Sequence, residues 1–123
     1  MRSQFEVKSR LTQYRGAQWL YRSYGYIAWQ ISTGENIEIV LIEAAEKRLG
    51  HGQALWKELC QHLILTTPPY NSVFTYHRWA NQEAEKFYNK LGFLYVLVPA
   101  LYRNEHAVLR VAKFPTLCAH LGV

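Results

Sequence analysis

Hydrophobic and polar residues alternate along much of the first third of the chain, as they do in strands whose two faces meet different surroundings. The segments 18–24 and 26–32 are rich in Trp, Tyr and Ile, which favour strands. After a turn at 33–36, apolar residues alternate again over Asn36–Ile42, and Phe5–Leu11 alternates more loosely. The pattern therefore predicts a meander of antiparallel strands.

The rest of the chain changes between helical and strand patterns. Leucines four residues apart predict a helix over Gln53–Leu65, and a second helix is expected between Asn81, a good N-cap residue, and Gly92, which suits a left-handed helix end. Short strands are expected at 72–76, 93–98 and 107–111, whereas 114–123 has no clear pattern. This order predicts an α/β (α+β) fold in which helices flank a single mixed, mostly antiparallel sheet.

The most informative motif is the loop Lys47–Gly52, which joins a predicted strand to a predicted helix. Its two glycines, Gly50 and Gly52, leave backbone amides accessible, and the first turn of a helix adds N–H groups without intrahelical partners. Such a corner can bind phosphate. A tight turn that uses glycine only for its positive φ is the alternative interpretation of the same motif.

Length and composition limit the classes of protein that remain. The chain of 123 residues predicts one domain, 1–123, and no apolar run is long enough to span a bilayer. Its first residues lack the apolar stretch of a secretory signal, and Cys60 and Cys118 are too isolated for a zinc site or a disulfide framework. We therefore expect a reduced, cytoplasmic protein without a metal.

The charge is positive and uneven. The net charge is +5, and residues 1–25 carry five basic residues but only one acidic residue, Glu6. A basic surface suits a polyanionic ligand, either a nucleotide-containing cofactor or a nucleic acid. The chain contains no aspartate, so any carboxylate chemistry must come from glutamate.

Two motifs together resemble the Gcn5-related N-acetyltransferase (GNAT) superfamily. The family's cofactor loop has the pattern Gln/Arg-x-x-Gly-x-Gly/Ala, which 47–52 matches with lysine at the first position. The family's second signature is a helix that begins with Asn and continues Ala-x-x-Phe-Tyr-x-Lys-x-Gly-Phe, and 81–93 fits it closely. The resemblance covers about Tyr26–Val111 and implies a GNAT-like acyl-CoA acyltransferase fold. Only 25 residues precede Tyr26, so the resemblance also implies a shortened N-terminal region.

The resemblance implies that the protein binds acetyl-CoA (coenzyme A) and assigns residues to it. In the family, the amides of the glycine loop hold the pyrophosphate, the end of the preceding strand pairs with the pantetheine arm, the helix Asn touches the pantetheine, and the Tyr lies by the thioester sulfur. Transferred to this chain, the cofactor-binding residues are Leu41, Ile42, Glu43, Lys47, Arg48, Leu49, Gly50, His51, Gly52, Gln53, Asn81 and Tyr88. Asn81 can equally be only an N-cap, and Tyr88 only a core aromatic residue.

Direct transfer of the acetyl group would need one group to assist the leaving thiolate and another to take a proton from the acceptor amine. The resemblance places Tyr88 in the first role. Glu38 is the favoured base, because it is flanked by apolar residues and partial burial makes a carboxylate a stronger base. Glu43 and His77 are the alternatives.

The leading hypothesis is therefore an acetyl-CoA-dependent N-acetyltransferase that acts on an amine of a small molecule or a protein. Family members usually place two helices between their first two strands, on the acceptor side. The acceptor pocket here would be open, built differently or completed by a second subunit of a homodimer. A non-catalytic acyl-CoA-binding or assembly module is the alternative. A nucleic-acid-binding module ranks below both, and the sequence gives no reason to expect membrane binding.

Overall fold

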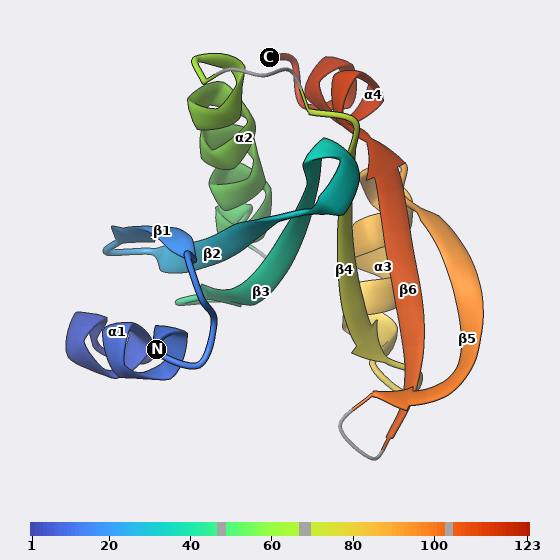
Figure 1. Ribbon diagram of the computed structural model, residues 1–123, viewed down its shortest axis with the longest axis horizontal. Helices are drawn as coiled ribbons and strands as arrows, with labels where there is room; N and C mark the ends of the chain where they lie inside the picture. Colours follow the sequence, from blue (N-terminus) through green and yellow to red (C-terminus); the bar gives the residue numbers. More distant parts are fainter. Residues whose placement is uncertain (47–48, 67–69, 103–104) are drawn as a thin grey trace.

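The computed structural model describes residues 1–46, 49–66, 70–102 and 105–123. They form four α-helices, a short 3₁₀ turn and one six-stranded sheet with the strand order β1-β2-β3-β4-β6-β5 (Figure 1). In chain order the elements are α1 (Gln4–Leu11), β1 (Gln18–Arg22), β2 (Gly25–Ser32), η1 (Thr33–Glu35), β3 (Asn36–Ala44), α2 (His51–Ile64), β4 (Ser72–Arg78), α3 (Gln82–Lys90), β5 (Leu94–Tyr102), β6 (Glu105–Lys113) and α4 (Phe114–His120). The mixed, mostly antiparallel sheet flanked by helices confirms the predicted fold class.

The sheet opens in its middle. Every pair of neighbouring strands is antiparallel except β3 and β4, which are parallel and are joined through α2. Their register contains only two pairs, Ile37 with Val73 and Glu38 with Phe74. Beyond these pairs β3 continues to Ala44 and β4 to Arg78, and the two strands diverge (Figure 1).

An irregularity in β3 changes the direction of its side chains just before the end of the strand. Ala28 of β2 is paired with Leu41, but the next residue, Trp29, is paired with Ile39, so Val40 is an extra residue in the ladder. This arrangement is a β-bulge. Ile39 packs in one core cluster, whereas Val40 and Leu41 both pack against the other cluster, so the alternation of faces restarts after the bulge.

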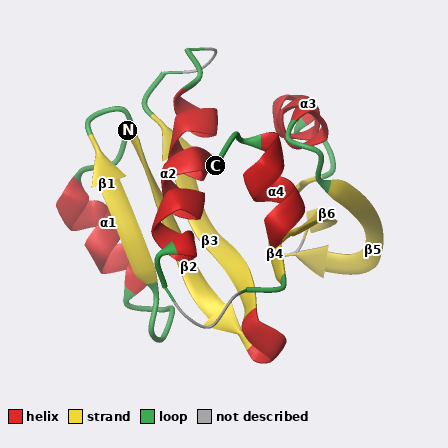
Figure 2. Cartoon of the chain, turned by 90° about the horizontal axis from the view of Figure 1, so that it is seen from above, coloured by secondary structure: helices red, strands yellow, loops and turns green. Residues whose placement is uncertain are grey.

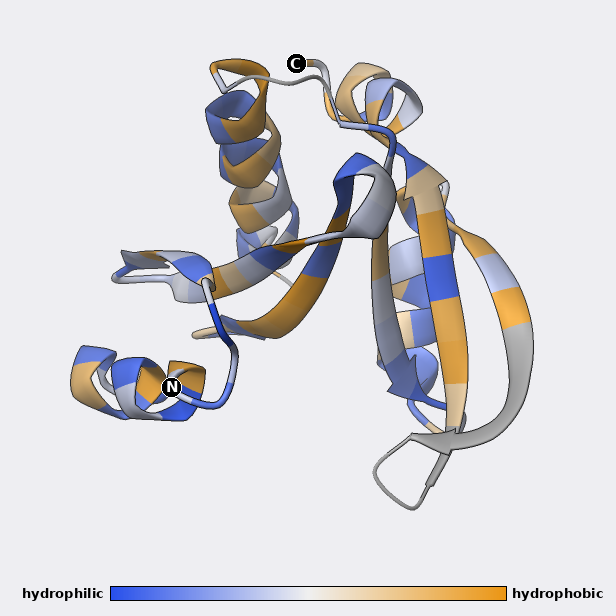
Figure 3. Ribbon diagram, in the orientation of Figure 1, coloured by the Kyte–Doolittle hydropathy of each residue, from blue (hydrophilic) through white to orange (hydrophobic). Residues whose placement is uncertain are grey.

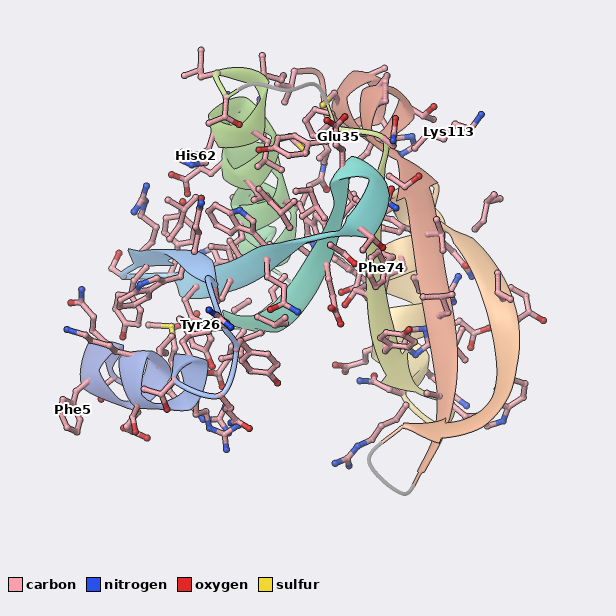
Figure 4. All side chains as sticks on the ribbon, in the orientation of Figure 1. Phe5, Tyr26, Glu35, His62, Phe74 and Lys113 are labelled. Atoms are coloured by element: carbon pink, nitrogen blue, oxygen red, sulfur yellow. The ribbon has the colours of Figure 1, made fainter. Side chains whose placement is uncertain are left out.

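The helices cover the sheet unequally. The larger core unites α2, α3 and α4 with one face, whereas α1 packs on the other face against the first strands (Figure 2). Helix α2 mixes apolar and polar positions (Figure 3), and its apolar positions are buried: Leu55, Trp56, Leu59, Cys60 and Leu63. Figure 4 shows Tyr26 between the sheet and α1, while Phe5 points away from α1 into solvent and is 80% exposed.

The prediction of a strand at Phe5–Leu11 is wrong, because this segment is helix α1. Ser3 and Glu6 form a capping box: the Ser3 hydroxyl accepts from the Glu6 amide at 3.2 Å, and the Glu6 carboxylate accepts from the Ser3 amide at 3.3 Å. Val7 and Leu11, four residues apart, supply the buried side. The Ser-x-x-Glu motif is a helix-start signal that outweighs a loose alternation.

The segment 114–123, for which no structure was predicted, contains helix α4. Phe114, Leu117, Cys118 and Leu121 are buried at helical spacing, and Pro115 lies in the first turn, where proline favours a helix start. The helix is only seven residues long, so its stripe is short and easily overlooked. It closes the larger core beside α2.

The ends of α3 are as predicted. The Asn81 side chain accepts a hydrogen bond from the Ala84 amide at 3.0 Å and so caps the helix. Gly92 has a φ of +80°, and the Phe93 amide returns to the Tyr88 carbonyl at 3.0 Å. Among the described helices, none has both the length and the apolar character needed to cross a membrane.

Gly25 provides a test of how closely β2 packs beside the end of β3. An added Cβ would lie 2.5 Å from the Glu43 carbonyl oxygen and 2.8 Å from Leu55 Cδ1. We expect Gly25→Ala to lower the free energy of unfolding by about 3 kcal/mol, because overpacking adds to an unfavourable φ. Gly16→Ala is the control: with a φ of +75° and no atom within 4 Å, it should cost only about 1 kcal/mol. If urea unfolding gave the same loss of unfolding free energy for both variants, the close approach of Gly25 to Glu43 and Leu55 would be contradicted.

Candidate functional site

A cleft of about 790 Å³ opens where β3 and β4 diverge. Three elements surround it: the end of β3, the glycine loop with the first turn of α2, and one side of α3. The predicted site residues that line it are Ile42, Glu43, Gly50, His51, Gly52, Gln53, Asn81 and Tyr88. The cleft thus brings together the two motifs that lie about thirty residues apart in the sequence.

The glycine loop has the geometry of a phosphate cradle. Gly50 is the N-cap of α2 with a φ of +77°, and an added Cβ there would meet no atom within 4 Å. The first helical hydrogen bond runs from the Ala54 amide to the Gly50 carbonyl at 3.0 Å. The amides of the residues between them therefore lie at the positive end of the helix, and these residues line the cleft. The predicted contributions of Lys47 and Arg48 lie outside the described residues.

Gly52 has a different function in the loop. An added Cβ would lie 3.1 Å from the ring of Phe87 on α3, which is tighter than ordinary van der Waals contact. Glycine at this position therefore lets the beginning of α2 approach α3, and this approach sets the width of the cleft.

His51 leaves one polar atom in the loop without a partner. Its ring contacts that of Tyr24, with centroids 5.4 Å apart. The Nδ1 atom is buried and has no hydrogen-bond partner within the part of the chain that the structure describes. Because His51 lines the cleft, a polar ligand group bound at the loop would offer the missing partner.

Tyr88 lines the cleft and is only 5% exposed. Trp56, Phe87 and Phe93 pack edge-on against its ring, which restricts the ring to one orientation. Burial raises the pKa of Tyr88 to about 12, although a hydrogen bond with the Thr75 side chain and the nearby charge of Arg110 oppose the increase. The hydroxyl is therefore protonated at neutral pH and is available as a hydrogen-bond donor.

Glu43 lines the cleft as an ionised carboxylate. Burial alone would raise the pKa of Glu43, but hydrogen bonds from the Arg2 backbone and the Tyr26 hydroxyl hold it below its ordinary value. The Arg2 amide donates to the Glu43 carboxylate at 3.0 Å. A carboxylate stabilised in its charged form is a weak base, so Glu43 is poorly suited to taking a proton from an amine.

Glu38 does not line this cleft. It is the last residue of β3 paired with β4, and its side chain accepts a hydrogen bond from Gln30 at 3.0 Å. Its neighbours Ile37 and Ile39 belong to the core under α2, so alternation along the strand places Glu38 on the opposite face of the sheet. On that face a second, shallower hollow of about 320 Å³ is lined by Asn36, Ser72, Phe74, Tyr76, Leu109 and Val111.

His77 has no free ring nitrogen. Its Nδ1 lies 2.9 Å from the Arg78 carbonyl oxygen, and its Nε2 accepts a hydrogen bond from Arg110 Nε at 2.9 Å. Burial and the charge of Arg110 lower the pKa of His77. This histidine is therefore neutral and fully hydrogen-bonded, and it does not have the accessible nitrogen that a general base requires.

Two predicted cofactor residues do not face the cleft with their side chains. Leu41 packs towards α1 because the bulge at Val40 reverses the faces, and Leu49 is 61% exposed. The sequence analysis in turn missed most of the α3 wall, whose further lining residues are Glu83, Ala84, Lys86, Phe87, Lys90 and Leu91. For Ala84 and Leu91, which lie three or four residues from Asn81 or Tyr88, this helical spacing was the available signal.

Within the described ranges, no group of His, Cys or Glu side chains is arranged to hold a metal ion. The polar groups of the cleft instead carry both signs of charge. Glu43, Glu46 and Glu83 are acidic, whereas Lys86 and Lys90 lie one turn apart on α3. A ligand that spans the cleft therefore needs both hydrogen-bond donors and anionic groups.

Comparison with solved structures relates this architecture to acetyltransferases. The chain is similar to a protein described as a GNAT-family acetyltransferase from Desulfovibrio desulfuricans, with a TM-score of 0.70 and 17% identity over 89% of this chain and 77% of that chain. It is similar to Ard1 from Thermoplasma volcanium, with a TM-score of 0.64 and 26% identity over 73% of this chain and 62% of that chain. It is also similar to NAA60 from Arabidopsis thaliana in complex with acetyl-CoA, with a TM-score of 0.62 and 15% identity over 92% and 85% of the two chains.

No protein-family profile matches the sequence, and no curated protein sequence matches it significantly. The similarity therefore rests on the arrangement of the elements rather than on overall sequence identity. It confirms the fold that the two sequence motifs predicted.

The contact between Gly52 and Phe87 can be tested without any ligand. We expect Gly52→Val to lower the free energy of unfolding by about 1–3 kcal/mol, because the new side chain must displace the Phe87 ring. Phe87→Leu should make room, so the double variant should be more stable than the sum of the single effects predicts. Gly50→Ala serves as the control: the space around Gly50 is open, so only the strain of its positive φ, about 1 kcal/mol, is expected, and Phe87→Leu should not change it. Strict additivity for Gly52 and Phe87 in chemical denaturation would show that the two residues do not touch.

Proposed function

Because the chain belongs by fold to the Gcn5-related N-acetyltransferase superfamily, we propose that it transfers an acetyl group from acetyl-CoA directly to an amine. One observation carries this proposal: a single cleft beside the diverging strands β3 and β4 is lined by both the glycine loop and Tyr88. A ligand that carries a phosphate group and a reacting thioester would meet both features in this cleft.

The residues present suit coenzyme A. The first amides of α2 and the open space at Gly50 would hold the pyrophosphate, and His51 Nδ1 would gain a partner. Beyond Glu38, the edge of β3 on the side of β4 is no longer paired with that strand. Its backbone groups can therefore form hydrogen bonds with the amides of the pantetheine arm. Lys86 and Lys90 on α3 are placed to contact the remaining phosphate. Bound in this way, acetyl-CoA supplies an acetyl thioester activated for attack by an amine.

Tyr88 stabilises the leaving thiolate by donating a hydrogen bond. The amine nitrogen forms a bond to the acetyl carbonyl carbon, the C–S bond breaks, and the sulfur leaves with the electron pair. With a pKa of about 12, Tyr88 is a weaker acid than a thiol of ordinary pKa near 8.5. Complete proton transfer to sulfur would therefore be uphill, so Tyr88 acts mainly as a hydrogen-bond donor in a dry site.

The acceptor amine approaches from the opposite face of the sheet. The hollow beside Phe74 and Tyr76 lies on that face, and Figure 4 shows Phe74 beside β4, where β3 begins to diverge. Glu38 is paired with Phe74 across the parallel ladder and points to the same side. It is therefore placed to take the proton that the amine loses, directly or through water.

Two other functions are less well supported. A non-catalytic acyl-CoA-binding module would have the same cleft but would not need Tyr88 or Glu38 at their positions. A nucleic-acid module would need exposed aromatic side chains, yet Tyr26 is buried, Tyr21 stacks on it, and the Tyr24 hydroxyl is hydrogen-bonded to Glu58.

The proposal is tested by measuring acetyl-CoA binding by calorimetry beside coenzyme A release with a panel of amines, including peptides with free N-termini. Binding together with amine-dependent release is expected. Binding without release for every amine would favour the non-catalytic module, and absence of binding would reject both.

We expect Tyr88→Phe to lower kcat by about a hundredfold, the effect of removing one hydrogen-bond donor from a developing negative charge. The affinity for acetyl-CoA should change little, because the ring and its packing are kept. The alternative is a structural hydroxyl, whose loss would lower the free energy of unfolding by about 1 kcal/mol and leave turnover nearly unchanged. Turnover and urea unfolding of the same variant distinguish the two.

Glu38→Gln should lower kcat/KM by about a hundredfold at neutral pH if Glu38 is the general base. The defect should become smaller as the pH rises, because a lysine-like amine with a pKa of about 10.4 then loses its proton without help. Glu6→Gln is the matched control, since glutamine also serves in the capping box of α1. A pH profile for Glu38→Gln that is parallel to the wild-type profile would assign the base elsewhere.

A further inference from the structure

A charged residue lies buried in the middle of β6. The strand runs Ala107-Val108-Leu109-Arg110-Val111-Ala112, and Figure 3 shows it as an apolar ribbon with a hydrophilic band in its middle. Arg110 is only 1% exposed. A buried cation is costly unless its surroundings compensate for lost hydration, so the position of Arg110 needs a physical explanation.

The hydrogen-bond partners of Arg110 are neutral groups on two neighbouring elements. Its Nε donates to His77 Nε2 on β4 at 2.9 Å, and its Nη1 donates to Asn89 Oδ1 on α3 at 2.8 Å. The guanidinium also lies over the ring of Tyr95, 5.4 Å from the centroid. Within the part of the chain that the structure describes, no ion pair joins Arg110 to a carboxylate, so its charge is not neutralised there by direct contact with an acid.

These bonds determine the protonation state of His77. Arg110 Nε can only donate, so His77 Nε2 must accept and carries no proton. The single ring proton is then on Nδ1, which donates to the Arg78 carbonyl oxygen at 2.9 Å. His77 is thus held as the neutral Nδ1–H tautomer in one ring orientation.

The oriented imidazole lies directly against Tyr88. The two rings are nearly parallel, with an interplanar angle of 7° and centroids 5.9 Å apart. Asn89, the second acceptor of Arg110, is the residue that follows Tyr88 on α3. Arg110 therefore fixes Tyr88 from two directions, through the stacked ring of His77 and through the helix that carries Tyr88.

We propose that Arg110 is a positioning residue for the transfer reaction, which holds His77 neutral against the Tyr88 ring and directs a positive charge towards the Tyr88 hydroxyl. The proposal rests on the proposed function, because it gives Tyr88 the role of donor to the leaving thiolate. A positive charge near that hydroxyl favours any negative charge that develops there or on the sulfur beside it. The charge of Arg110 also acts to lower the pKa of Tyr88, in agreement with this direction.

The arrangement of His77 can be observed without any activity. The charged and titratable groups that face His77 are Arg110 from β6 and Tyr88 and Glu85 from α3. Nitrogen chemical shifts of the imidazole should show the neutral Nδ1–H tautomer in the wild-type protein, with a pKa below that of an ordinary histidine. In Arg110→Met the pKa of His77 should rise, because the neighbouring positive charge and the bond to Nε2 are both lost. An Nε2–H tautomer in the wild type, or an unchanged titration in the variant, would overturn the proposal.

Kinetics test whether this arrangement serves Tyr88. Arg110→Met should lower kcat by about tenfold, the lower end of the effect of losing an outer hydrogen-bond partner, and leave the KM for acetyl-CoA unchanged. In a Tyr88→Phe background the same substitution should have almost no further effect on kcat, because the group on which it acts is absent. Arg15→Met, which removes an exposed arginine that does not line the cleft, is the matched control and should behave as the wild type. Equal losses of kcat in both backgrounds would reduce Arg110 to a structural residue and overturn the proposal.

A second variant covers the case in which Arg110→Met does not fold. Arg110→Lys keeps the charge, but one ammonium group does not reproduce the planar fork that reaches both His77 and Asn89. It should therefore still show a lower kcat and an altered His77 spectrum, whereas wild-type values for both would overturn the proposal. Wild-type protein that binds acetyl-CoA but never releases coenzyme A would reject the proposed function and with it the kinetic role of Arg110. The His77 spectra would then decide the orientation of the imidazole independently.

Discussion

The short parallel ladder between β3 and β4 is the constraint on which the site depends. Paired strands lie about 4.8 Å apart, too close for any ligand to enter between them. Here the pairing ends after Glu38 and Phe74, and the two strands diverge while the rest of the sheet stays paired. The gap leaves one edge of β3 open, at the place where the glycine loop begins, and every other feature of the cleft is arranged around this gap.

The second wall of the cleft, α3, is held in place by two different kinds of contact. Gly52 lets the start of α2 approach Phe87 closely, so the steric fit sets how near the two helices lie. The hydrogen bond from Arg110 to Asn89 ties the last turn of α3 to the sheet. The edge-on aromatic packing restricts the Tyr88 ring, and the hydrogen bonds of Arg110 to His77 and Asn89 add a second constraint on its orientation.

Local signals predicted much of this structure. The cap at Asn81, the left-handed Gly92 and the leucine spacing of α2 each depend on residues close in sequence, and all three elements were predicted correctly. The errors arose where two local signals competed. The loose alternation at Phe5–Leu11 suggested a strand, but the capping box of Ser3 and Glu6 and the pair Val7 and Leu11 make a helix.

The sequence by itself determined the order of the elements from β1 to β6, the glycine loop and the caps of α3, because each of these depends on the chemistry of residues near one another in the chain. Only the tertiary structure decided which face of the sheet each side chain of β3 occupies. The bulge at Val40 turns Leu41 away from the cleft, and pairing with β4 places Glu38 on the opposite side from the glycine loop. The contact between Arg110 and His77 joins residues 33 positions apart, and no local pattern encodes it. Contacts between distant strands follow from register, and register is a property of the whole sheet.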